Sequence, residues 1–143
     1  MRSCDVNILV YAYDVRHPRR AEYVEWLQEV ANGPEDFGLS SVVLSSFVRI
    51  ATHPKILVRP LTPQHAVDIA DELRAAPSAV AMDPGPRHWS IFTDLCRKLE
   101  AKGNTVPDAY LAAVAIEHRC EWNTTDRGFA RFPGLRWRHP LDH

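Results

Sequence analysis

The chain has 143 residues, of which 45% are hydrophobic and 24% are charged, so it is long enough for one domain with a buried core. Its formal net charge of −1 gives no global sign of nucleic-acid binding, although a basic rim beside an acidic site would not show in that sum. The three cysteines, Cys4, Cys96 and Cys120, are too scattered for a disulfide framework or a zinc pattern, which favours the cytoplasm.

Neither a membrane span nor a signal peptide is expected. The longest apolar candidate, Tyr110 to Ile116, is much shorter than the ~20 residues that a membrane-crossing helix needs. Asp5 interrupts the N-terminal region where a signal peptide would need an unbroken apolar run. We therefore expect a cytoplasmic protein with no membrane partner and a single domain over residues 1–143.

Short strands alternate with amphipathic helices along the chain, a pattern typical of an α/β fold with a parallel sheet. A very short first strand is expected to end just before Asp5. Further strands are predicted at 37–40, 80–82, 121–124 and 135–138, and helices at 7–14, 19–31, 41–52, 63–76, 87–102 and from Pro107 onward. We thus predict a central, mainly parallel sheet of about five short strands with helices on both faces.

Several residues mark helix boundaries and the core. Thr62 is the expected N-cap of the helix that begins at Pro63, and Gly103 the expected C-cap of helix 87–102. Large aromatic residues inside the helical patterns are expected in the core, where some of them could line a groove for a partner helix; they are Tyr23, Trp26, Phe47 and Trp89.

Three aspartates fall at the edge of the sheet where the strands end. Asp5 follows the first strand, Asp126 follows strand 121–124, and Asp108 lies in a first helical turn, where the helix dipole favours negative charge. Ligands of open α/β sheets bind beyond the carboxyl ends of the strands. Carboxylates gathered there repel each other unless a cation neutralises them. Oxygen-only ligands suit Mg²⁺ or Mn²⁺ rather than zinc.

Each aspartate also has a purely structural interpretation. Asp108 alone is equally consistent with a carboxylate that serves the helix dipole, Asp5 with a turn at a strand end, and Asp126 with an Asx turn. The three together favour a metal site. In that hypothesis Asp5 and Asp108 bind the ion, and Asp126 binds it directly or through water.

Four motifs in order, and the end of the chain, resemble a known family. The motifs are Asp5-x-Asn7 before an apolar helix, FVRIATHP at 47–54, VPDAYLAA at 106–113 and TDRGF at 125–129, followed by FPGLRW at 132–137. Over nearly its whole length the chain resembles a PIN-domain ribonuclease of the VapC toxin type. This implies a PIN-like three-layer domain, a metal-dependent endoribonuclease, a cognate VapB-like antitoxin, and a homodimer or a dimer of toxin–antitoxin pairs.

The sequence departs from the family pattern at two positions. Many family members carry a glutamate on the helix after the second strand, where this chain has Ser46, and Gly128 stands where a further acid is common. The remaining acids are expected to hold one Mg²⁺ well, and a second only with the help of substrate phosphate. Either the Ser46 hydroxyl orients a metal-bound water, or activity is reduced.

Other residues are candidates for supporting roles. Asn7 and Thr125 can hold a carboxylate or a metal-bound water, although Asn7 can instead cap the first helix and Thr125 can be a strand residue. Candidate RNA contacts are Arg49, His53 and Arg127, with a second basic group at Arg131, Arg136 and Arg138. A solvated helix end explains the first two equally well.

Two other functions compete with the nuclease. The first is a PIN-fold module with a weakened site that only binds an antitoxin or RNA, for which Ser46 is the main argument. The second is a haloacid dehalogenase-like phosphatase, because Asp5-Val6-Asn7 faintly resembles the nucleophile motif of those enzymes. Such phosphatases need a second aspartate at the position of Asn7, so the sequence disfavours this alternative.

Overall fold

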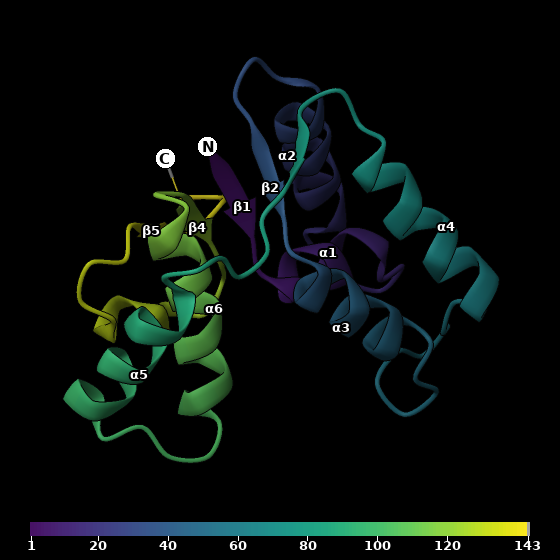
Figure 1. The fold of residues 1–143 in the computed structure, drawn as a ribbon. Coiled ribbons are helices and arrows are strands. Elements are labelled where there is room, and N and C mark those ends of the chain that lie inside the picture. The colour runs from purple at the N-terminus through teal and green to yellow at the C-terminus, as the bar shows by residue number, and fades with distance from the viewer. Residues whose placement is uncertain (143) are drawn as a thin grey trace.

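The computed structural model describes residues 1–142, which form a five-stranded parallel sheet with helices around it (Figure 1). The strands are β1 (Arg2–Cys4), β2 (Phe37–Leu39), β3 (Ala79–Ala81), β4 (Glu121–Asn123) and β5 (Trp137–Arg138). The helices are α1 (Val6–Tyr13), α2 (Arg20–Asn32), α3 (Ser41–Ala51), α4 (Pro63–Arg74), α5 (His88–Leu99), α6 (Thr105–Glu117) and the short 3-10 helix η1 (Arg127–Arg131). The predicted α/β architecture is confirmed.

The strand order places a switch point beside β1. The order is β3-β2-β1-β4-β5, and every neighbouring pair is parallel. The chain steps from β1 to β2 to β3 in one direction, then returns past both to form β4 on the other side of β1. Because such crossovers are right-handed, α1 to α4 cover one face and α5 and α6 the other, and Figure 1 shows these two groups apart. The carboxyl ends of β1 and β4 therefore flank a typical ligand position.

β1 ends where Asp5 turns the chain into α1. The Asp5 backbone is extended (φ −72°, ψ 159°), and its side chain accepts a hydrogen bond from the N–H of Val6, so Asp5 is the N-cap of α1. Ile8, Leu9 and Val10 follow at once and are buried between α1, α2 and α3. The apolar run thus fixes α1 against the core and holds Asp5 at the sheet edge.

α6 packs closely because its buried residues are small. Ala109, Ala112, Ala113 and Ala115 are fully buried, and the helix packs against α5 and β4. A helix surface made of alanines brings its backbone near its neighbours, so the first turn of α6 and its Asp108 stay beside the sheet edge.

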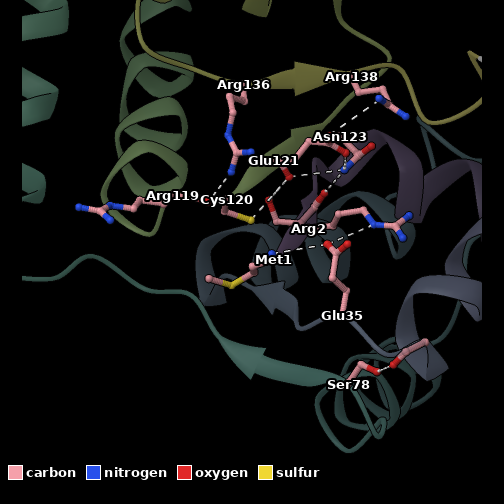
Figure 2. Close-up of polar contacts among 12 residues, drawn as sticks. Met1, Arg2, Glu35, Ser78, Arg119, Cys120, Glu121, Asn123, Arg136 and Arg138 are labelled. Atoms are coloured by element: carbon pink, nitrogen blue, oxygen red, sulfur yellow. Dashed lines mark hydrogen bonds and ion pairs between the residues drawn. The ribbon is translucent and has the colours of Figure 1, made fainter.

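Polar contacts join the strands from the two ends of the chain (Figure 2). The buried Asn123 amide on β4 donates to the carbonyl of Ser3 on β1 at 3.1 Å and to the carbonyl of Glu121 at 3.4 Å. Arg2 and the N-terminal amine both pair with Glu35 at 3.5 Å. A buried amide needs its partners, so Asn123 specifies the register between β1 and β4.

The predicted N-cap of α4 is confirmed, whereas the predicted end of α5 and its predicted cap at Gly103 are wrong. Thr62 caps α4, since its hydroxyl accepts from the N–H of His65. α5 ends at Leu99 instead of Lys102, because Glu100 takes the left-handed conformation (φ 48°) that was predicted at Gly103. Gly103 (φ 53°) lies in the loop to α6.

The expected aromatic core is correct in three positions out of four. Tyr23, Trp26 and Phe47 are buried, but Trp89 on α5 is 68% exposed and contacts Phe92 at 5.5 Å between ring centroids. The helical spacing placed Trp89 on the apolar face, yet in this first turn it is His88, 3% exposed, that packs against Tyr110 of α6 at 4.3 Å between ring centroids. None of the helices in residues 1–142 is long and apolar enough to cross a membrane.

Candidate functional site

Three buried polar side chains lie side by side just beyond the carboxyl ends of β2, β1 and β4. They belong to Ser40, Asp5 and Thr124, which are 2%, 7% and 0% exposed. Cys4 pairs with Asn123 in the sheet, and the N–H of Asp5 donates to the carbonyl of Asn123 at 2.8 Å. The next residues along the two strands, Asp5 and Thr124, are therefore neighbours. We call Ser40, Asp5 and Thr124 the edge row.

The Thr124 hydroxyl connects two of the predicted acids. It donates to Oδ2 of Asp5 at 2.8 Å and accepts from the N–H of Asp126 at 3.0 Å. Oδ1 of Asp5 accepts from the N–H of Val6 at 2.7 Å. Both oxygens of Asp5 are thus held, and its rotamer is set by the protein.

Asp126 is exposed and begins η1. Its Oδ1 accepts from the N–H of Gly128 at 2.8 Å, which is the Asx turn considered above. This turn leaves Oδ2 of Asp126 available at the surface of the same edge. The structural and the chemical interpretations of Asp126 are therefore compatible.

The three carboxylates repel one another. Burial raises the pKa of Asp5 to about 6, the hydrogen bonds from Thr124 and Val6 act against this, and the charges of Asp108 and Asp126 raise it further. Burial also raises the pKa of Asp108, while Arg131 acts in the opposite direction and Asp126 adds to the rise. The edge therefore carries more negative charge than its own hydrogen bonds neutralise.

A positively charged side chain, that of Arg131, already contacts one of the three acids. Nη2 of Arg131, at the end of η1, donates to Oδ2 of Asp108 at 2.9 Å. Both side chains are partly exposed, at 36% for Arg131 and 28% for Asp108. Asp108 is thus both a carboxylate in the first turn of α6 and one half of an ion pair.

The donor set suits a hard divalent cation. In residues 1–142 no three His, Cys, Asp or Glu side chains converge closely enough to hold an ion as they stand. However, the available ligands are all oxygens, and the Oδ1 of Asn7 is buried without a hydrogen-bond partner in the described part of the chain. A buried acceptor without a donor is costly. Carboxylate and amide oxygens are the donor types that Mg²⁺ and Mn²⁺ prefer, and all three aspartates could serve only if Arg131 released Asp108.

Asn7 does not cap the first helix. Asp5 has that role, and Asn7 stands in the first turn of α1 with its oxygen buried. Ser46 lies half-buried on α3, and Thr125 lies half-buried beyond the end of β4 rather than within it. The two groups that hold the Asp5 carboxylate come from Val6 and Thr124, so neither Ser46 nor Thr125 performs that task.

The candidate RNA contacts are not paired with the acids in residues 1–142, although Arg127 follows Asp126 directly. Arg49 and His53 are at the C-terminal end of α3, and Nδ1 of His53 accepts from the N–H of Lys55 at 3.1 Å. Arg127 pairs with Asp142 at 3.1 Å. Within residues 1–142, Arg49, His53 and Arg127 form no hydrogen bond or ion pair with the three aspartates of the cluster.

Thr124 and Ser40 were missed because the expected strands were one residue too long. Both were placed inside strands, whereas they are the first residues beyond them. A polar residue at the same position as Asp5 on a neighbouring strand is the signal that identifies them. Arg131 was considered only for RNA, and its contact with Asp108 across 23 residues has no signal in the sequence.

Comparison with known proteins adds independent findings. A model of the PIN domain matches residues 4–135. The chain is 45% identical over 142 residues to VapC ribonuclease Mb2897 of Mycobacterium bovis, covering 99% of this chain and 97% of that protein. Its fold is similar to VapBC2 from Rickettsia felis bound to a DNA fragment from their promoter (TM-score 0.70, 22% identity, 96% of each chain). It is also similar to a toxin–antitoxin complex from Klebsiella pneumoniae (TM-score 0.66, 20% identity, all of both chains).

Proposed function

The chain belongs to the PIN-domain family of VapC ribonucleases, and we propose that it is a metal-dependent endoribonuclease, the toxin of a toxin–antitoxin pair. The observation that supports the proposal is that Thr124 links Asp5 and Asp126 at the switch point between β1 and β4, with Asp108 near enough for its charge to raise the pKa of Asp5. The relatives' name supports RNA as the substrate. The three free cysteines of this chain, two of them buried, suit the reducing cytoplasm.

The proposed reaction is hydrolysis of an RNA phosphodiester, in which a water oxygen bonds to phosphorus and a ribose oxygen leaves with a proton. A bound Mg²⁺ or Mn²⁺ supplies polarisation of the phosphoryl oxygen and acidifies the attacking water. Asp5 and Asp108 would hold the ion, with Asp126 doing so directly or through water. Thr124 and Val6 fix both Asp5 oxygens, so this ligand is oriented before the substrate arrives.

Two further side chains serve the attacking water in this proposal. In this proposal the Oδ1 of Asn7, buried without a hydrogen-bond partner in residues 1–142, accepts a hydrogen bond from that water. Ser46 on α3 replaces a glutamate and contributes a hydroxyl in place of a charge. A site with three acids then needs substrate phosphate to attract a second ion.

The proposed partner is a cognate antitoxin. The named similar structures are toxin–antitoxin complexes, and a groove between α2 and α4 offers an apolar surface of the kind that amphipathic helices bind. Val24, Leu27 and Leu73 line this groove, with Arg20 and Glu72 also among its lining residues. Co-expression of the antitoxin should restore the growth that the toxin alone arrests, and light scattering should show a dimer or a pair of toxin–antitoxin pairs.

A cleavage assay tests the nuclease directly. Purified protein should cut RNA in Mg²⁺ or Mn²⁺ and stop when EDTA is added. Asp108→Asn should reduce the rate roughly 100-fold or more, since losing even an outer partner of a metal site costs 10–100-fold. Asp68→Asn, the same change on an exposed residue of α4, is the matched control and should keep the parent rate. Cleavage that persists in EDTA or in Asp108→Asn would refute the metal mechanism.

One observation favours a second candidate, the binding module with a weakened site. Asp108 is already paired with Arg131, and Ser46 stands where the resemblance to the family leads us to expect a glutamate. In that case the protein would bind RNA or the antitoxin, and RNA would stay intact in both metals. The same assay, read by gel for cleavage and by gel shift for binding, separates the two.

A further inference from the structure

The side chain of Arg131, the last residue of η1, reaches Asp108 by passing over Gly128, which has no side chain. A Cβ at Gly128 would stand 2.7 Å from Nη1 of Arg131 and 2.9 Å from Oδ1 of Asp126. The guanidinium therefore passes over Gly128, beside the Asp126 carboxylate, and reaches Oδ2 of Asp108 at 2.9 Å. The absence of a side chain at Gly128 leaves room for this cation.

The Arg131 guanidinium has a second contact that does not depend on Asp108. Its Cζ lies 4.8 Å from the ring centroid of Phe132, which is 2% exposed and held by Phe129. An aromatic face attracts a guanidinium but leaves its N–H donors free. Arg131 can therefore leave Asp108 and remain at the rim of the site with donors available.

The ion pair between Asp108 and Arg131 is easy to displace. Both side chains are partly exposed, and exposed pairs of this kind contribute little to stability. A divalent ion carries twice the charge of the guanidinium and would compete for the same Asp108 oxygens. The released guanidinium matches the geometry of a phosphate, which it binds with two parallel hydrogen bonds.

We infer that Arg131 is a partner-switching residue, which pairs with Asp108 in the metal-free protein and contacts an RNA phosphate once a divalent ion holds Asp108. The inference rests on the proposed function and adds a role for one residue. In the metal-free state Arg131 reduces the repulsion among the acids. In the loaded state it positions the substrate beside them.

The pairing of Arg131 with Asp108 in the metal-free protein is tested by measuring Mn²⁺ binding with electron paramagnetic resonance. Arg131→Gln should bind Mn²⁺ about two- to fivefold more tightly than the parent, because the ion no longer competes with the guanidinium. Arg127→Gln removes the same charge from the same 3-10 helix, but its partner is Asp142, so it should bind like the parent. Equal tightening in both variants would mean a general field effect and would overturn the inference, as would no tightening in Arg131→Gln.

RNA binding with Ca²⁺ in place of Mg²⁺ tests the second half. If Arg131 contacts one phosphate of a single strand, Arg131→Gln should weaken binding and lower the slope of log affinity against log salt by about 0.7. Arg131→Lys keeps the charge and should retain most of that slope. Arg74→Gln is the control, because Arg74 ends α4 just before β3, the outermost strand on the other side of β1 from β4. This variant should change RNA affinity and its salt slope little. An unchanged slope in Arg131→Gln would overturn the switch.

Failure of this inference is distinguishable from failure of the proposed function. If the parent cuts RNA in Mg²⁺ while Arg131→Gln has parental Mn²⁺ affinity and salt slope, only the inference fails. If the parent neither binds Mn²⁺ nor cuts RNA, the nuclease proposal itself fails.

Discussion

Replacing Asp5 by Asn should stabilise the metal-free protein at neutral pH. Asp5 is 7% exposed, and its pKa rises to about 6 from 3.8 through burial and through the charges of Asp108 and Asp126, against the hydrogen bonds that it accepts. Asn has nearly the same size and is an equally good helix N-cap, so α1 keeps its start. The substitution removes the charge and replaces one of the two acceptor oxygens by an amide NH₂ group.

The sign and the size follow from proton linkage. Because the folded protein binds the Asp5 proton more tightly than the unfolded chain does, the free energy of unfolding falls as pH rises from about 3.8 to about 6. At 1.36 kcal/mol per pKa unit the loss is about 3 kcal/mol above that window. The variant gives up the charge-assisted bond from Thr124, worth about 1–2 kcal/mol. A net gain of about 1–2 kcal/mol at pH 7.5 remains.

Urea unfolding in EDTA at pH 4.5 and 7.5 measures this. About 2 kcal/mol of the penalty develops between these two values, so the advantage of Asp5→Asn should shrink or reverse at the lower pH. Asp68→Asn, whose carboxylate is exposed, should follow the parent at both. A variant that is less stable than the parent at pH 7.5, by the same amount as at pH 4.5, would refute the reasoning.

Changes at Thr124 and Ser46 test the surroundings of the site, and a change at Glu117 tests a contact that holds the end of α6. Thr124→Val should lower Mn²⁺ affinity 10–100-fold by freeing the Asp5 carboxylate; a titration that matches the parent contradicts this. Ser46→Glu should tighten metal binding and raise cleavage at low Mg²⁺, while Ser46→Ala should cost little; a large loss with alanine would mean that the hydroxyl acts directly. Glu117→Ala should lower the stability by about 1 kcal/mol in thermal melts, because Glu117 accepts from the N–H groups of Gly85 at 2.7 Å and Arg87 at 2.9 Å. An unchanged melting temperature would argue against that tie.

The order and type of the main strands and helices could be predicted, because hydrophobic periodicity reports which face of an element is buried. Boundaries were less accurate where two signals compete. Thr124 has a β-branched side chain and was included in β4, and its N–H still donates to the carbonyl of Arg138 at 3.0 Å, but β4 ends at Asn123 and the Thr124 hydroxyl contacts Asp5 and Asp126. At α5, Glu100 turned the chain earlier than the glycine that was expected to do so.

The position of Asp5 and Asp126 at one edge of the sheet followed from topology, while the hydrogen-bond and ion-pair partners of the acids did not. Asp5 and Asp126 end neighbouring parallel strands, so a rule about strand ends brings them to one edge. The contact between Arg131 and Asp108 depends on a 3-10 turn after Asp126 and on the open space above Gly128. Neither leaves a periodic pattern in the sequence, so such contacts appear only in three dimensions.

The hydrogen bond between Asp5 and Thr124 joins residues that are 119 positions apart. During synthesis, the first strand leaves the ribosome long before the strand that must pair with its open side. Until that later strand arrives, the carboxylate has neither the hydroxyl that orients it nor Asp126 nearby. A fragment that stops before residue 121 therefore has no complete cluster, however well its first helices fold. The proposed nuclease site is therefore complete only once nearly the whole chain has been made.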